Sequence, residues 1–284
     1  VRVSAQPRLG GGLSAVAAAM RRYPYGCMEQ KISVAVALRD QVLWERWVAQ
    51  IPAYMDADGL VKYFPSTTHG DPVLTAYILA ISHEAGWIIP EALRRQAAQG
   101  LKLFLDGSLV RYSPLPTADL AIRKLAAVEA LSRYGEAEPK LLGSIAVDPN
   151  LWPTSAVIDW VGILLNMPGL PNRAERLAQA EQVLRARLTY QGTVLAFSTE
   201  ASDRLWWLMV SNDVNAVRLV LTALRLDAWQ ADISRLVRGA LARQRAGCWD
   251  LTTANAWGVL AMERFSQKYE AEPVTGTPRV ELAG

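Results

Sequence analysis

The chain has 284 residues, of which 51% are apolar and 20% are charged, so it can bury a sizeable core in one large domain or two small ones. Its 30 Lys and Arg residues against 27 acidic residues leave a formal net charge of +3. A charge this small creates no strong field for nucleic acid or for an anionic membrane surface. We therefore expect neither as a direct partner.

The first residues of the chain and its number of cysteines further limit the class of protein. The sequence begins with Val1 and not with a methionine, and no leader with a charged and then an apolar segment follows. No apolar run approaches the roughly 18 residues of a membrane-spanning helix. We read the chain as a fragment of a longer protein. Two cysteines, Cys27 and Cys248, do not make a disulfide-rich scaffold or a four-cysteine zinc site. We expect no metal ion and no cofactor.

Helical periodicity extends over most of the chain. In 89–107 and in 172–188, apolar residues recur every three to four positions among charged ones, which predicts half-exposed helices. The segments 32–38, 73–82 and 156–165 are apolar on every side, which is typical of fully buried helices. Exposed and buried helices are therefore predicted to alternate.

One type of connection recurs between these helices. A turn residue with or near Gly, then an aromatic residue, then a Ser, Thr or Pro helix start is found in ADGLVKYFPST, LDGSLVRYSPLPT, DPNLWPTS, YQGTVLAFST and AGCWDLTT. The spacing of about 40 to 50 residues is typical of a helical-hairpin array. With YPYGCMEQ as the first member, the pattern predicts roughly six hairpins and about twelve helices.

These constraints predict an all-α fold. An α/α toroid, with an outer ring of amphipathic helices around an inner ring of buried ones, satisfies them, and an open solenoid of the same hairpins is the alternative. We assign the domain to 13–268. Segments 1–12 and 269–284 lack helical periodicity and are expected to be linkers or ends of neighbouring domains.

In a toroid, every connection from an outer helix to the next inner helix emerges at the same end. That end is predicted to hold Cys27, His69, Thr117, Trp152, Phe197 and Cys248.

The stretch RRYPYGCMEQ carries the chemistry. Pro24 and Gly26 predict a tight turn, and the apolar run after Gln30 predicts a helix whose N-terminus lies near Cys27. Residues three apart in a first turn face the same side, so the Gln30 carboxamide is within reach of the Cys27 sulfur. A helix N-terminus also lowers the pKa of a thiol.

Two chemistries fit this arrangement. Cys27 as a hydrolase nucleophile needs an oriented base, and the chain offers only His69 and His83, neither in a recognisable pairing with it. Alternatively, the sulfur attacks the Gln30 carboxamide, expels ammonia and stores an internal thioester, which is an electrophile for an incoming amine or hydroxyl.

The motif PYGC-x-EQ resembles the hallmark of the thioester domains of alpha-2-macroglobulins and complement thioester proteins. Met28 departs from the glycine of animal members, whereas bacterial members commonly carry a larger residue there. YFPSTTHGDPVLTAYILAIS and GCWDLTTANAWGVLAM resemble further parts of the same domain. The resemblance covers 13–268 and implies an α/α toroid of six hairpins.

The resemblance implies a protease inhibitor and not an enzyme. A protease cuts a bait segment elsewhere in the parent protein, and the uncovered thioester then acylates a lysine of that protease. Cys27 is the expected leaving group, Gln30 the acyl donor, and Glu29 a motif residue without an evident role. Tyr23, Tyr25 and Met28 either shield the bond from water or, for Tyr23 and Met28, only pack the turn.

Complement members use a histidine from the third hairpin's loop for transfer to hydroxyls. Thr117 occupies that position here, so the resemblance implies an amine-preferring thioester. His69, in the loop of another hairpin at the same end, is either a substitute or an exposed loop histidine. His83, inside a helix, is expected to be a packed histidine without a chemical role.

Cys248 stands where the family usually has glycine before the tryptophan, here Trp249. We expect either an inert buried thiol or a thiol that captures Cys27 as a disulfide when the thioester is lost.

Two other functions stay open. The tryptophans permit an isoprenoid enzyme with an aromatic-lined toroid, although no DDxxD or DxDD cluster is present. The third reading is a helical scaffold with a dead thioester. By resemblance, the parent is expected in the periplasm as a lipoprotein of the inner membrane, with other domains of the parent covering the thioester and this domain making no direct membrane contact.

Overall fold

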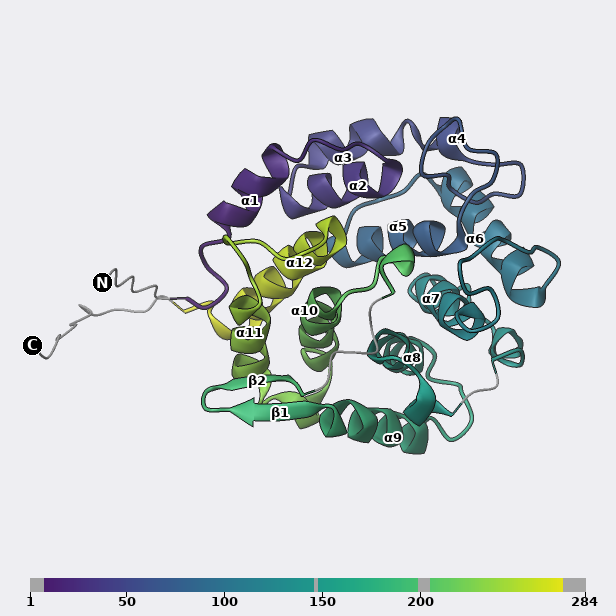
Figure 1. The fold of residues 1–284 in the computed structure, drawn as a ribbon. Helices are drawn as coiled ribbons and strands as arrows, with labels where there is room; N and C mark the ends of the chain where they lie inside the picture. Colours follow the sequence, from purple (N-terminus) through teal and green to yellow (C-terminus); the bar gives the residue numbers. More distant parts are fainter. Residues whose placement is uncertain (1–7, 146–147, 199–204, 273–284) are drawn as a thin grey trace, which may run out of the picture.

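The computed structural model describes residues 8–145, 148–198 and 205–272. Within them the chain forms twelve α-helices, which confirms the all-α class (Figure 1). The helices are α1 (Ser14–Arg21), α2 (Met28–Ala37), α3 (Gln41–Val48), α4 (Ile51–Tyr54), α5 (Pro72–Ala85), α6 (Glu91–Asp106), α7 (Leu120–Ser132), α8 (Thr154–Asn166), α9 (Arg173–Ala186), α10 (Asn212–Ala223), α11 (Ile233–Ala242) and α12 (Thr252–Tyr269).

Six of these helices make a closed cycle of contacts in the described part of the chain. α2 packs on α5, α5 on α7, α7 on α8, α8 on α10, α10 on α12, and α12 returns to α2 (Figure 1). Their sequences explain the burial: α5 reads PVLTAYILAISHEA and α8 reads TSAVIDWVGILLN, and nearly every residue of each is buried. Helices that are apolar on all sides need neighbours on all sides, and a closed cycle supplies them.

The amphipathic helices α1, α3, α6, α9 and α11 pack on the outside of this cycle (Figure 1). In α6, Ala97, Leu101 and Phe104 are buried at spacings of three to four, while Arg95 on the other face is exposed. Each outer helix precedes an inner helix in the sequence. The alternation expected from the hydrophobic pattern is therefore present over these segments.

One outer position differs from the expected hairpin. Between α7 and α8 the described residues contain two short 3-10 helices, Pro139–Leu142 and Pro149–Leu151, in place of an α-helix. Each begins with a proline, which has no N–H to donate and disrupts a helix interior.

A β-hairpin was not expected. β1 (Leu188–Gln191) pairs antiparallel with β2 (Val194–Phe197), so YQGTVLAF is a two-residue hairpin turn with its strands and not a loop before a helix. Gly192 takes a positive φ of 61° in that turn, which favours glycine. β2 packs on α11, where a Cβ at Gly239 would approach the Leu195 carbonyl oxygen to 2.2 Å.

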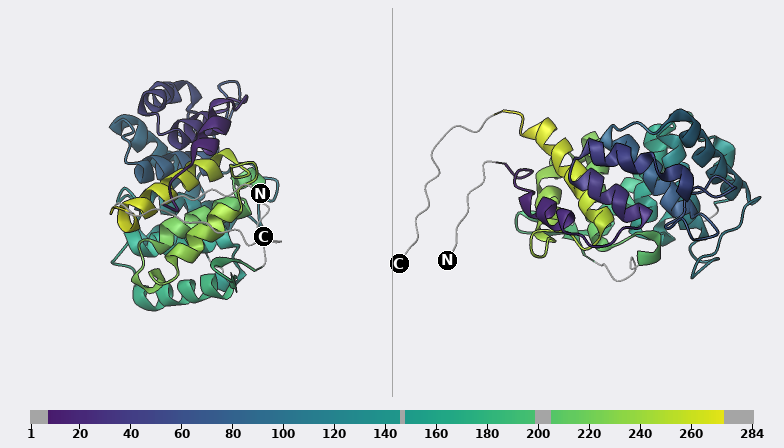
Figure 2. Two further views of the ribbon diagram at one scale, coloured as in Figure 1. Left: turned by 90° about the vertical axis from the view of Figure 1, so that its left-hand side faces the viewer. Right: turned by 90° about the horizontal axis from the view of Figure 1, so that it is seen from above.

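The described ends of the chain meet. The backbone N–H groups of Leu9 and Gly10 donate to the Glu270 carboxylate, and Figure 2 shows the start of α1 and the end of α12 on the same side of the molecule. Most of the expected tails at 1–12 and 269–284 lies outside the described residues, which begin at 8 and end at 272, and the division at 13 and 268 stays a prediction.

Candidate functional site

The loops that precede the inner helices contact one another at one end of the molecule. The carbonyl of Tyr63, before α5, accepts from the Met28 N–H at 2.9 Å at the start of α2. The indole N–H of Trp207, before α10, donates to Asp119 at 3.0 Å, before α7. This end holds Cys27.

Cys27 is the N-cap residue of α2, with φ −67° and ψ 167°. Its side chain faces the Gln30 backbone N–H, and the Gln30 Oε1 atom accepts from the Cys27 backbone N–H at 3.0 Å. This is a capping box in which cysteine takes the place of serine or threonine. The chain from Tyr23 to Gly26 reaches it as an irregular connection and not as the expected tight turn. The Gln30 carboxamide therefore folds back over the residue that carries the thiol.

The nitrogen of the Gln30 carboxamide also makes a hydrogen bond. Its Nε2 donates to the Tyr23 hydroxyl at 3.3 Å. The Tyr23 ring meets Tyr25 edge-on, with 5.7 Å between ring centroids, and Tyr25 is 68% exposed. Tyr23 thus contacts the predicted acyl donor directly, whereas Tyr25 contacts Tyr23 and is exposed to solvent.

The Cys27 thiol is buried, with 7% of the residue exposed. Burial raises its pKa above the usual value, and the Glu29 carboxylate adds to this effect, while the backbone N–H groups of Gln30 and Glu29 oppose it. The expectation of a lowered pKa is wrong, because loss of hydration outweighs the helix N-terminus. The thiol is therefore mostly protonated at neutral pH.

Glu29 is buried and links two helices of the cycle. Its Oε1 accepts from Ser33 Oγ at 2.7 Å in the same helix and from Thr252 Oγ1 at 2.6 Å at the start of α12. Ser33 also bonds the Tyr77 hydroxyl at 2.7 Å. Burial raises the pKa of Glu29, although both hydroxyl bonds oppose the shift. Glu29 fixes the start of α2, and with it the capping box, against α12.

Met28 and Tyr63 lie beneath and beside the cysteine. Met28 is fully buried in the core, which agrees with packing and not with an external cover. Burial raises the pKa of Tyr63 well above its usual value, and Asp71, Glu29 and Cys27 contribute in the same direction, so Tyr63 belongs to the same electrostatic environment. Tyr63 was not among the predicted site residues, although it belongs to the aromatic residues that recur in each connection.

The other loop residues that were predicted at this end are not part of the Cys27–Gln30 capping box. His69 and Thr117 are exposed, on the loops before α5 and α7. In the part of the chain that the structure describes, no hydrogen bond joins either of them to Cys27 or Gln30. Trp152 is buried just before α8, and Phe197 is the last residue of β2 and not part of a loop before an inner helix.

Cys248 is half-buried in a turn, where its Sγ lies 3.5 Å from the Arg245 carbonyl oxygen. Both cysteines are free thiols. Trp249 is buried, donates from Nε1 to the Ala240 carbonyl at 2.8 Å, and packs on Gly258 of α12. Trp249 therefore anchors the loop that leads into α12 and Thr252.

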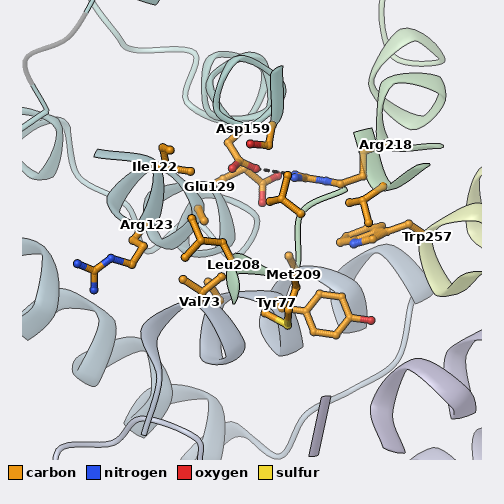
Figure 3. A pocket seen from close by; sticks show the side chains of 16 residues that line it. Val73, Tyr77, Ile122, Arg123, Glu129, Asp159, Leu208, Met209, Arg218 and Trp257 are labelled. Atoms are coloured by element: carbon orange, nitrogen blue, oxygen red, sulfur yellow. Dashed lines mark hydrogen bonds and ion pairs between the residues drawn. The ribbon is translucent and has the colours of Figure 1, made fainter. Parts of the chain in front are cut away.

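The inner helices enclose a pocket, and side chains from a loop at the Cys27 end fill part of it (Figure 3). Leu208 and Met209, from the loop before α10, face Val73 of α5, and Arg218 pairs with Asp159 at 2.5 Å deeper inside. Among the residues that the structure describes, no group of three or more His, Cys, Asp or Glu side chains is arranged for a metal ion. No described helix is long and apolar enough to cross a membrane.

Comparison with known proteins gives a structural likeness. No family model and no curated protein matches the sequence. Native Escherichia coli alpha-2-macroglobulin aligns with a TM-score of 0.64 and 17% identity over 92% of this chain. Salmonella alpha-2-macroglobulin reacted with methylamine aligns with 0.65 and 21% over 91%, and trypsin-activated E. coli alpha-2-macroglobulin with 0.60 and 16% over 89%.

At these identities the likeness establishes a shared fold. The chain spans 17%, 18% and 19% of the lengths of these three proteins, so its fold corresponds to one part of each.

Proposed function

We propose that the chain is the thioester domain of a bacterial alpha-2-macroglobulin-like protease inhibitor, folded as an α/α toroid of inner and outer helices. The observation that carries the proposal is the capping box, in which Gln30 Oε1 lies 3.0 Å from the Cys27 backbone nitrogen and the Cys27 side chain faces the Gln30 backbone N–H. The likeness to alpha-2-macroglobulins of known structure supports the same assignment.

The first step forms the thioester. The Cys27 sulfur attacks the carboxamide carbon of Gln30, the carbon–nitrogen bond breaks, and the nitrogen leaves as ammonia with the thiol proton. The Cys27 N–H polarises the Gln30 carbonyl, because it donates to the oxygen on which negative charge develops. The Tyr23 hydroxyl lies against the leaving nitrogen. Burial raises the pKa of Tyr23, so this hydroxyl stays protonated at neutral pH.

The second step consumes the thioester. A lysine amine of the attacking protease adds to the acyl carbonyl, the carbon–sulfur bond breaks, and Gln30 is left joined to the lysine through an amide while Cys27 recovers its proton. A protonated thiol is the stable product at a site where burial raises the pKa of Cys27. Thr117, which replaces the histidine of complement members, fits a preference for amines.

Other domains of the parent are proposed to cover this end until a protease cuts the bait. Several large apolar side chains on the loops around it are exposed, namely Tyr25, Phe64, Tyr112, Leu151 and Trp206. Apolar side chains gathered at one end of a molecule favour contact with protein. We place the parent in the periplasm as a lipoprotein of the inner membrane, with proteases as its targets and without nucleic acid or direct membrane contact by this domain.

A conjugation assay tests the function. The longer protein that carries this chain is mixed with trypsin, and covalent adducts that survive denaturation are identified by peptide mass spectrometry. We expect a Gln30–lysine cross-link that Cys27→Ala and Gln30→Ala abolish and that Cys248→Ala leaves intact. An adduct of equal yield in the Cys27→Ala protein contradicts the proposal.

A further inference from the structure

A second cavity lies at the end of the molecule opposite Cys27. It forms where the C-terminal ends of α5, α7, α8, α10 and α12 converge. The charged and titratable residues that line it are His83, Glu84, Arg133, Arg225, Arg264 and Lys268. None of them takes part in the thioester chemistry.

The cavity carries an excess of positive charge. Arg133 pairs with Glu84 at 2.9 Å and with Glu129 at 2.7 Å, and Arg264 lies 3.6 Å from the same Glu84 carboxylate. The wall thus carries four cationic side chains and one carboxylate, Glu84, and Glu129 pairs with Arg133 from outside the wall, which leaves two positive charges without a counterpart among these groups. Arg225, Arg264 and Lys268 are exposed, so the cavity is open to solvent and its positive charges can attract an anion, most strongly at low salt.

Two of these cations interact with carbonyl oxygens at the ends of helices. Arg264 donates to the Glu84 carbonyl at 3.0 Å and Lys268 to the Leu224 carbonyl at 2.9 Å, so both satisfy backbone oxygens at helix C-termini. Arg225 differs, because its Nη2 donates to the neutral Asn166 side chain at 2.7 Å. Within the described residues, no carboxylate forms a salt bridge with Arg225.

The electrostatics of neighbouring groups agree with this picture. Partial burial lowers the pKa of Arg225, and the charge of Arg133 lowers it further, while the Glu129 and Glu84 carboxylates oppose the shift from a distance. Burial would raise the pKa of Glu84, but Arg133, Arg264 and Arg225 together hold it below its usual value. Burial and Arg133 lower the pKa of His83, so His83 is neutral at pH 7. A bound anion would offset the mutual repulsion of the cations.

We propose that this cavity is a binding site for a small oxyanion with two negative charges, held by the Arg225 guanidinium and by Lys268. A guanidinium presents paired N–H donors that match the oxygens of phosphate or carboxylate groups. Such a ligand can be a free phosphate or dicarboxylate, or a pair of acidic side chains on a protein segment. The site is independent of Cys27.

Isothermal titration calorimetry on the 284-residue chain at low salt tests the site. The probes are inorganic phosphate, succinate and a short peptide with adjacent Asp and Glu residues, with chloride as the control anion. We expect one saturable site that Arg225→Gln weakens about tenfold, because a charge-assisted contact is lost. Lys268→Gln provides a second variant, and Arg95→Gln on the exposed face of α6 is the matched control.

The results separate the sources and decide the proposal. Saturable binding of phosphate or succinate identifies a free small anion, and binding of the peptide alone identifies a protein segment. Cys27→Ala is expected to bind with unchanged affinity, so failure of the thioester proposal does not affect this one. The absence of saturable binding for all three probes, or an equal loss of affinity in Arg95→Gln and Arg225→Gln, overturns it.

Discussion

Thr252, the first residue of α12, donates its hydroxyl proton to the Glu29 carboxylate in the first turn of α2 at 2.6 Å, across 223 positions of sequence. The same Glu29 oxygen accepts from Ser33. This contact joins the first and last inner helices, so the position of the Cys27–Gln30 capping box depends on the closure of the cycle. Glu29, a motif residue without an evident role in the sequence, has here a positioning role.

Replacing Glu29 is expected to lower the free energy of unfolding. Glu29→Ala leaves the buried Thr252 hydroxyl without its acceptor and removes one of the two partners of Ser33, at a cost of about 1 to 3 kcal/mol. Glu29→Gln retains an acceptor oxygen and is expected to cost less. Urea unfolding measures both, with Glu175→Ala at the exposed start of α9 as the control. An equal effect of Glu29→Ala and Glu175→Ala contradicts this role.

The Glu29 carboxyl group also predicts that the free energy of unfolding depends on pH. Because burial raises the pKa of Glu29 in the folded state, the folded chain binds more protons than the unfolded chain between the two pKa values. The contribution of Glu29 to stability therefore falls as pH rises from about 4.3, its unfolded pKa, through the folded value. Glu29→Gln is expected to flatten this part of the profile of unfolding free energy against pH, and identical slopes in both proteins contradict it.

Asp56 and Arg111 join the loops before α5 and α7. Asp56 accepts from the Leu60 and Gly70 N–H groups and pairs with Arg111 at 2.9 Å. Burial would raise the pKa of Asp56, but these donors hold it below its usual value. Asp56→Asn is expected to cost about 3 kcal/mol, because it removes the buried one of the two carboxylates that pair with the largely buried Arg111 guanidinium.

The control for this pair is Asp58→Asn, since Asp58 meets the same Arg111 from a more exposed position. The Asp56 contribution is present above its unfolded pKa of about 3.9 and is lost as pH falls through the lower folded value. Urea unfolding at several acidic pH values measures this loss. A larger destabilisation by Asp58→Asn than by Asp56→Asn would refute this account.

Trp249 and Gly258 are predicted to be tightly coupled. A Cβ at Gly258 would approach the Trp249 ring to 2.4 Å, so Gly258→Ala forces the ring or α12 to move and is expected to cost about 1 to 3 kcal/mol. Gly169→Ala is the matched control, because nothing lies within 4 Å of its Cβ position. Thermal unfolding compares the two, and equal melting temperatures argue against the packing described.

The reactivity of Cys27 should reflect its surroundings. Because burial and Glu29 raise the pKa of the thiol, alkylation of the free Cys27 thiol by iodoacetamide is expected to accelerate at higher pH than that of a model cysteine, near 8.5. Glu29→Gln removes a negative charge and shifts the midpoint downward. Rates are measured in Cys248→Ala, and a midpoint below the model value contradicts this prediction.

Local patterns predicted the helices well. The apolar runs at 32–38, 73–82 and 156–165 fall within or largely within α2, α5 and α8, and the amphipathic segment 89–107 contains α6. The three-residue spacing of Cys27 and Gln30 also indicated their shared side of a first turn, because this relation is local.

Long-range relations were beyond such patterns. Nothing near Thr252 or Tyr63 in sequence indicates Glu29 or Cys27 as neighbours, because the return of α12 to α2 brings Thr252 to Glu29 and the packing of α5 on α2 brings Tyr63 to Cys27. The predicted direction of the Cys27 pKa shift was wrong for the same reason, since the burial that raises this pKa depends on tertiary packing. The hairpin at 188–197 was missed because its glycine turn was interpreted as a helix start.

Intact-mass spectrometry before and after methylamine, on the longer protein that carries this chain, tests the thioester most directly. The account predicts a mass lower than the sequence mass by one ammonia and no alkylation of Cys27. Methylamine should then add to Gln30 and release one thiol at Cys27, with neither change in Gln30→Ala. A full sequence mass together with immediate alkylation of Cys27 in the untreated protein would contradict the account.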